Sequence, residues 1–229
     1  MALADLVLLF DVDNTLVDND TVQEQLHDHL ARQFGEEAAR RYWVLYEEQR
    51  QVEGFADYLG ALQRYRLEDL NDPRLLGMSE FLLDYPFHDR LFPGALDAVH
   101  HAATLGRPVI LSDGDAVFQP RKVHLAGLWK AFHGHVLIYV HKEQMLANIE
   151  HWYPAHHYVV IDDKLAILDA IKQQWGERVT TVFVRQGHYA NDEETLAKHP
   201  PADLDLGSIA ELISVTAAEL TGAASLSQP

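Results

Sequence analysis

Hydrophobic residues along the chain gather into short continuous runs. The first run lies within "MALADLVLLF" and ends at residue 10, and the others are "RPVILS", "HVLIYV", "HYVVID" and "VTTVFV", around residues 110, 138, 160 and 182. Strands that are buried on both faces, as in a parallel sheet, have continuous rather than alternating apolarity. The pattern therefore predicts a sheet of parallel strands.

Segments with helical spacing separate these runs. Leu165, Leu168 and Ile171 form one apolar stripe, and residues 94–105 form a second candidate helix that Gly106 would end. Strands that alternate with helices are typical of an α/β, doubly wound (Rossmann-like) parallel sheet with right-handed crossovers. We expect this fold for the core.

The long stretch between the first and second predicted strands contains no convincing strand pattern. Four of its segments have apolar residues at the spacing of amphipathic helices. They cover residues 22–34, 36–50, 55–62 and 75–84. We interpret residues 18–92 as an inserted helical cap, and residues 1–17 and 93–229 as a Rossmann-like catalytic core.

The composition is that of a globular protein, with 229 residues of which 48% are hydrophobic and 23% charged. No stretch approaches the roughly 20 apolar residues that cross a bilayer, and the N-terminus lacks the basic region of an export signal. We therefore expect a cytoplasmic protein with no membrane partner. The net charge of -17 argues against a nucleic-acid partner, because nucleic-acid binding normally relies on a basic patch.

Cysteine is absent, which excludes disulfides, thiolate nucleophiles and zinc–thiolate sites. The 14 histidines include "HGH" at residues 133–135, but no H-E-x-x-H spacing occurs. We interpret these histidines as solvated or packed side chains rather than metal ligands.

Polar residues stand where the predicted strands end. They are Asp11, Asp13, Ser112, Asp113, Gly114, Lys142, Asp162 and Asp163. Ligands of open parallel sheets bind at the carboxyl ends of the strands, where the loops converge. We therefore expect these side chains to share a single rim of the sheet.

This ordered set resembles the four motifs of the haloacid dehalogenase-like (HAD) hydrolase superfamily, and the helical insertion resembles the cap of its phosphatase-type members. The resemblance implies that Asp11 is a nucleophile that forms an aspartyl phosphate. It implies that Asp13 protonates the leaving oxygen and later activates water. Ser112 and the backbone N–H groups of Asp113 and Gly114 would then hold phosphate oxygens.

A nucleophilic carboxylate repels a phosphate dianion, so the site needs positive charge. Mg²⁺ is a hard ion that prefers oxygen ligands, and it is the cofactor we expect. By resemblance its ligands would be Asp11, the backbone carbonyl of Asp13, and Asp162, with Asp163 steadying a coordinated water. Lys142 would supply a second cation for the transferring group. The pocket would then attract phosphate although the surface is acidic.

Each candidate also has a structural interpretation. Asp163 would cap the helix that follows it, Ser112 would be a turn residue, and Lys142 would be a solvated side chain. Asp20 is a candidate N-cap at the start of the insertion, and Arg185 beside the last predicted strand is interpreted as a surface residue.

Two positions depart from the common family pattern. Asn14 stands where Gly is frequent, and Asn also adopts unusual turn geometry. Asp113 stands where an uncharged residue is usual. Its carboxylate would repel a phosphate unless it points away.

The expected function is Mg²⁺-dependent hydrolysis of a small phosphate ester, which would be the protein's partner. A haloacid dehalogenase or a phosphomutase on the same fold, or a metabolite-binding protein without catalysis, are the alternatives. Family members with dehalogenase activity typically lack the second Asp of the first motif and need no metal. Asp13 therefore argues against a dehalogenase.

Overall fold

The computed structural model describes residues 3–68 and 72–222, and in them six parallel strands form one sheet of order β3-β2-β1-β4-β5-β6. The strands are β1 Ala4–Phe10, β2 Arg107–Asp113, β3 Val136–Tyr139, β4 Ala155–Asp162, β5 Val179–Val184 and β6 Leu204–Leu206. The predicted doubly wound α/β fold is confirmed. The short edge strand β6 was not predicted, because its three residues form no apolar run.

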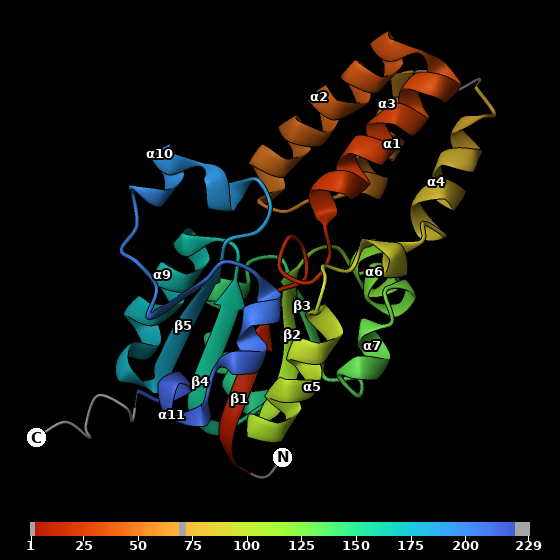
Figure 1. The fold of residues 1–229 in the computed structure, drawn as a ribbon. Coiled ribbons are helices and arrows are strands. Elements are labelled where there is room, and N and C mark those ends of the chain that lie inside the picture. Colours follow the sequence, from red (N-terminus) through yellow and green to blue (C-terminus); the bar gives the residue numbers. More distant parts are fainter. Residues whose placement is uncertain (1–2, 69–71, 223–229) are drawn as a thin grey trace, which may run out of the picture.

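Helices cover both faces of the sheet (Figure 1). They are α5 Ala95–Leu105, α6 Phe118–Leu125, α7 Leu128–Ala131, α8 Leu146–Trp152, α9 Leu165–Trp175, α10 Glu193–Leu196 and α11 Ala217–Leu220. Short 3₁₀ turns join them at Phe87–Arg90, Lys142–Gln144, Gly176–Arg178, Tyr189–Asn191 and Ile209–Ser214. None of the helices in the described part of the chain has the length and apolarity to cross a bilayer.

The central strand β1 explains why the apolar runs are continuous. Leu8 and Phe10 belong to the hydrophobic cluster on one face of the sheet, whereas Val7 and Leu9 belong to the cluster on the other face. Since successive side chains of a strand point to opposite faces, a strand that is covered on both sides must be apolar at every position.

The stretch between β1 and β2 is helical, as expected. It contains α1 Asn19–Phe34, α2 Glu36–Glu53, α3 Tyr58–Glu68 and α4 Leu75–Leu83. These helices stand beyond the carboxyl ends of the strands (Figure 1). Their buried residues, such as Leu26 and Tyr42, belong to the same hydrophobic cluster as Phe87 and Phe118 below them. The insertion therefore packs continuously onto the sheet layer.

The first helix of the insertion begins two residues earlier than the Asp20 cap would place it. Asp18 is the N-cap, and its side chain accepts hydrogen bonds from the backbone N–H and the hydroxyl of Thr21. The interpretation of Asp20 as the N-cap is therefore wrong. Asp20 instead pairs with His188, with 2.6 Å between Oδ1 and Nδ1.

Candidate active site

The register of the sheet brings the acidic residues together. Phe10 of β1 lies beside Ile161 of β4, so the next residues along each strand, Asp11 and Asp162, become neighbours. The Lys142 amine lies between them, with its Nζ 2.5 Å from Asp11 Oδ1 and 2.7 Å from Asp162 Oδ2. All three side chains are buried. The predicted meeting of these three residues at one rim is found.

The Lys142 amine is held as a cation. Burial alone would lower its pKa, but the carboxylates of Asp11, Asp162 and Asp113 raise the pKa well above its usual value. The interpretation of Lys142 as a solvated side chain is therefore wrong. Its charge faces the carboxylates and not the solvent.

Asp163 is the clearest candidate for a metal ligand in the described residues. Both of its carboxylate oxygens are buried and have no hydrogen-bond partner in the described residues. The same is true of Asp11 Oδ2. Asp163 does not cap α9, whose N-terminus has no side-chain cap, so that interpretation is wrong. Burial raises the pKa of Asp163 well above its usual value. The charges of Lys164 and Lys142 lower this pKa only in part, so the two oxygens without a hydrogen-bond partner suit a further cation.

The three acidic residues fit a hard divalent cation. Each of Asp11, Asp162 and Asp163 offers an oxygen, and these oxygens lie within 4.8 Å of one another. Such a set of carboxylate oxygens suits Mg²⁺. Among the described residues this is the group found with the geometry to hold a metal, and no histidine belongs to it.

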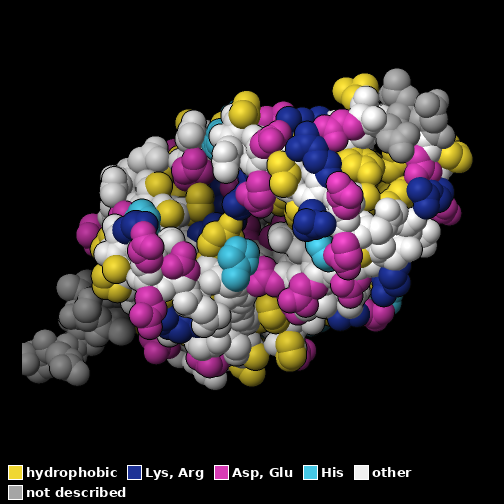
Figure 2. Space-filling view, turned by 90° about the horizontal axis from the view of Figure 1, so that it is seen from above, with side chains coloured by type: hydrophobic (Ala, Val, Ile, Leu, Met, Phe, Trp, Pro, Cys, Tyr) yellow, Lys and Arg dark blue, Asp and Glu magenta, His cyan; other side chains and the backbone are white. Residues whose placement is uncertain are grey.

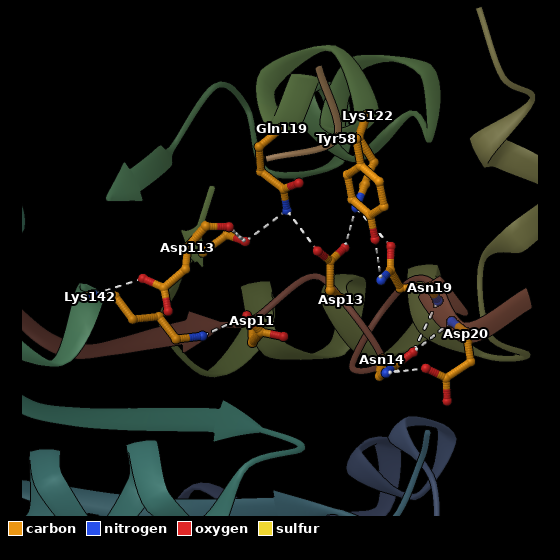
Figure 3. Close-up of polar contacts among 11 residues, drawn as sticks. Asp11, Asp13, Asn14, Asn19, Asp20, Tyr58, Asp113, Gln119, Lys122 and Lys142 are labelled. Atoms are coloured by element: carbon orange, nitrogen blue, oxygen red, sulfur yellow. Dashed lines mark hydrogen bonds and ion pairs between the residues drawn. The ribbon is translucent and has the colours of Figure 1, made fainter. Parts of the chain in front are cut away.

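Asp13 turns away from Asp11 and toward α6 (Figure 3). Its Oδ1 lies 2.7 Å from Lys122 Nζ, and its Oδ2 lies 3.4 Å from Gln119 Nε2. Sequence reasoning missed both partners. One signal was present: Lys122 follows Phe118 at the i, i+4 spacing and so shares the buried side of α6.

The loop after β2 is tied down by several hydrogen bonds. Ser112 Oγ accepts from Gln119 Nε2 at 2.9 Å and is buried. The Gly114 N–H donates to the carbonyl of Tyr139, so in this structure that amide is already paired. The Asp113 carboxylate accepts from the backbone N–H of Lys142 at 2.8 Å, and burial raises its pKa to about 6. Asp113 thus faces the loop after β3.

A cavity of about 340 Å³ opens between this rim and the helical insertion. Figure 2 shows the hollow from above, with acidic, basic and histidine side chains around it. Residues that line it from both sides include Asp13, Asn19, Arg50, His141, Lys164 and His188. The volume is suited to a small metabolite.

The insertion also contacts the core directly beside this cavity. Arg50 of α2 donates to the hydroxyl of Tyr189 at 2.8 Å, and Asp20 of α1 accepts from the backbone N–H of His188 at 2.8 Å. Arg185 does not take part. It forms a surface ion pair with Asp205, as its interpretation as a surface residue predicts.

Comparison with known proteins gives a consistent result. The family model described as haloacid dehalogenase-like hydrolase matches residues 6–174. A crystal structure from Burkholderia xenovorans LB400, described as a haloacid dehalogenase-like hydrolase, shares 56% identity over 93% of this chain and 99% of that chain, with a TM-score of 0.89. No curated protein matched.

Two more distant structures share the fold. L-2-haloacid dehalogenase from Xanthobacter autotrophicus, with chloropropionic acid covalently bound, is 18% identical over 91% of this chain and 96% of that chain, with a TM-score of 0.59. The HAD-hydrolase YfnB from Bacillus subtilis, bound to magnesium, is 15% identical over 92% of this chain and 97% of that chain, with a TM-score of 0.62.

Proposed function

Because the chain belongs to the haloacid dehalogenase-like hydrolase family, we propose that it is a Mg²⁺-dependent phosphatase of small phosphate monoesters. The observation that carries this proposal is the buried trio of carboxylates in which the oxygens of Asp163 have no hydrogen-bond partner. A phosphatase of this kind needs a cation beside its nucleophile, since carboxylate and phosphate repel each other.

Asp11 is the proposed nucleophile. Its Oδ1 is fixed by the Lys142 amine, and its Oδ2 has no hydrogen-bond partner, which leaves one oxygen available to attack phosphorus. In the first step the bond from this oxygen to phosphorus forms while the bond from phosphorus to the leaving oxygen breaks. Water then attacks the phosphorus and returns Asp11 to a carboxylate.

Asp13 is the proposed acid and base. It lines the cavity, so it can reach the leaving oxygen of a bound ester. It gives a proton to that oxygen in the first step, and it accepts a proton from the attacking water in the second. Ser112 and Lys142 remain the proposed contacts of the phosphate oxygens. The Gly114 amide would first have to release the Tyr139 carbonyl.

The acidic trio would hold the Mg²⁺ ion. Asp162 is already engaged, because its Oδ1 accepts from the Lys164 N–H and its Oδ2 pairs with Lys142. We therefore assign the direct contacts to Asp11 and Asp163, with the Asp13 carbonyl kept from the family resemblance. Asp162 then has the supporting role that the sequence suggested for Asp163. When bound, the ion would offset the charge of the phosphoryl group.

A haloacid dehalogenase is the second candidate, because several solved neighbours are described as L-2-haloacid dehalogenases. At 18% and 19% sequence identity, the likeness to these proteins shows only that the fold is shared. Two features of this chain favour phosphate. A halide leaves without a proton, so a dehalogenase would have no use for Asp13 as an acid. It would also have no use for a buried carboxylate such as that of Asp163, whose oxygens have no hydrogen-bond partner.

The test measures two products with one enzyme sample. We expect phosphate release from an aryl phosphate in the presence of Mg²⁺, its loss after treatment with EDTA, and its return when Mg²⁺ is added. Chloride release from 2-chloropropionate that survives EDTA, without phosphate release, would instead establish the dehalogenase. Isomerisation of a sugar phosphate would indicate a phosphomutase, and tight metabolite binding without turnover would indicate a binding protein.

A further inference from the structure

We propose that Lys122 is a positioning residue that holds Asp13 in the orientation needed to protonate the leaving oxygen. This inference rests on the proposed phosphatase function. It assigns a role to a residue outside the four family motifs, and it ties that role to the seating of the helical insertion.

The Lys122 amine is completely buried at 0% exposure, and it makes two polar contacts. Its Nζ donates to Asp13 Oδ1 at 2.7 Å and to Asn19 Oδ1 at 2.9 Å (Figure 3). Aromatic rings surround the rest of the group. The Nζ lies 5.9, 5.7 and 5.2 Å from the ring centres of Tyr58, Phe87 and Phe118.

Stability alone does not account for this arrangement. Removing an ammonium group from water costs several kcal/mol before its partner is counted, and a buried ion pair is often no more stable than apolar residues of the same volume. An apolar side chain would also fill a site lined by aromatic rings. What the charge adds is a fixed direction for the Asp13 carboxylate.

The Asp13 carboxylate contacts α6 on one side and borders the cavity on the other. Lys122 and Gln119 of α6 take up its two oxygens, while 23% of its side chain is exposed and lines the cavity. Without these contacts, a carboxylate side chain beside a cavity would rotate about its single bonds among several rotamers. A group that must meet the leaving oxygen within hydrogen-bond distance gains from losing that freedom.

The same amine connects Asp13 to the helical insertion. Asn19 is the first residue of α1, and its Nδ2 contacts the hydroxyl of Tyr58 in α3 at 3.3 Å. The Lys122 amine thus joins the loop after β1, helix α6 and the base of the insertion. The amine that orients Asp13 therefore also contacts the first residue of α1.

The chemical consequence depends on the leaving group. The phenolate that leaves phenyl phosphate is a strong base and needs a proton as the bond to phosphorus breaks. The 2,4-dinitrophenolate that leaves 2,4-dinitrophenyl phosphate is a weak base and departs without one. A displaced Asp13 should therefore slow the first substrate much more than the second.

The experiment compares kcat/KM for these two substrates, because kcat/KM reports the first chemical step and not the hydrolysis of the intermediate. We expect Lys122→Met to lower the value for phenyl phosphate by about 10²-fold or more, the range of one general acid, and to change the value for 2,4-dinitrophenyl phosphate by less than about tenfold. Both substrates are assayed on the same sample, so a smaller folded fraction scales both values equally and cancels from their ratio.

Two further variants complete the test. Lys122→Gln keeps one donor toward Asp13, so its ratio of the two kcat/KM values should lie between those of Lys122→Met and the wild type. It also replaces Lys122→Met in the test if that variant does not fold. Tyr58→Phe removes the hydroxyl contact to Asn19 but keeps the ring over Lys122, and its ratio should match the wild type. An equal fall for both substrates in both Lys122 variants would overturn the positioning role. A wild-type protein that hydrolyses neither ester would overturn the phosphatase function itself.

Discussion

Two buried lysines each hold one of the two carboxylates that follow β1. Lys142 fixes Asp11 at 2.5 Å, and Lys122 fixes Asp13 at 2.7 Å. Each carboxylate thereby points in its own direction, although only Val12 separates them in the sequence. The same two cations offset part of the acidic charge at this rim, in a protein with a net charge of -17.

Asp113 makes the stability of the protein depend on pH. Burial raises its pKa from 3.8 to about 6, so between these values the folded state keeps a proton that the unfolded state has released. The stabilisation of the folded state by this proton is present below about pH 4 and is lost as the pH rises through about 6. Between these two pH limits the free energy of unfolding therefore changes by at most about 3 kcal/mol.

We therefore expect Asp113→Asn to unfold at higher urea concentration than the wild type at pH 7 and to lose this advantage at pH 4. The amide oxygen of Asn can still accept from the Lys142 N–H. Urea denaturation of both proteins across this pH range gives the difference in free energy of unfolding. A difference that does not change with pH would show that Asp113 is not the group responsible.

At the scale of elements, the strand ends did most to reveal the site. Continuous apolar runs located five strands, and parallel pairing required their carboxyl ends to meet, so Asp11, Lys142 and Asp162 could be grouped from the sequence. The contact of Asp13 with Lys122 could not, because it joins residues 109 positions apart through the packing of one helix. Which Asp oxygens lack a partner also depends on side-chain directions that periodicity does not contain.

The turn between β1 and α1 depends on Asn14. This residue has a φ of 61°, and its Oδ1 accepts from the backbone N–H groups of Asn19 and Asp20 at 3.0 and 3.2 Å. The unusual turn geometry expected for Asn14 is therefore found. Its side chain helps to satisfy the first turn of α1, which a Gly at this position could not do.

We expect both Asn14→Gly and Asn14→Ala to lower the free energy of unfolding, with Ala the more damaging. Each variant loses the three hydrogen bonds of the Asn14 side chain, which include one from its Nδ2 to Asp20 Oδ1. The two that cap α1 are worth about 1 kcal/mol together, and Ala adds the strain of a left-handed backbone, about 1–2 kcal/mol. Urea denaturation at neutral pH measures both. An Ala variant as stable as the Gly variant would contradict the strained turn.

At the scale of the whole molecule, the insertion and the sheet form one wall each of the cavity. The contacts of Arg50 with Tyr189 and of Asp20 with His188 join the two walls beside the cavity. Because the hydrophobic cluster also runs from the insertion into the core, the division at residues 17/18 and 92/93 stays a prediction.

Metal binding should show in the stability of the whole chain. We expect Mg²⁺ to raise the thermal midpoint of the wild type, because binding to the folded state adds about 2.7 kcal/mol at a hundredfold excess over the dissociation constant. Asp163→Asn should be the more stable protein without metal, since it removes a buried carboxylate that has no hydrogen-bond partner, and should gain little from Mg²⁺.

Asp5→Asn is the matched control, because it makes the same chemical change at an exposed position of β1. It should respond to Mg²⁺ as the wild type does. A thermal midpoint of Asp163→Asn that rises with Mg²⁺ as much as that of the control would remove Asp163 from the metal site.

The most direct test of the account is to trap the covalent intermediate on Asp11. Enzyme and aryl phosphate are mixed with Mg²⁺, quenched in acid during the first turnover and treated with borohydride, which reduces an aspartyl phosphate to homoserine. Peptide mass spectrometry should find homoserine at position 11, and Asp11→Asn should give neither homoserine nor phosphate. Homoserine at another aspartate, or none in a reaction that releases phosphate, would contradict the account.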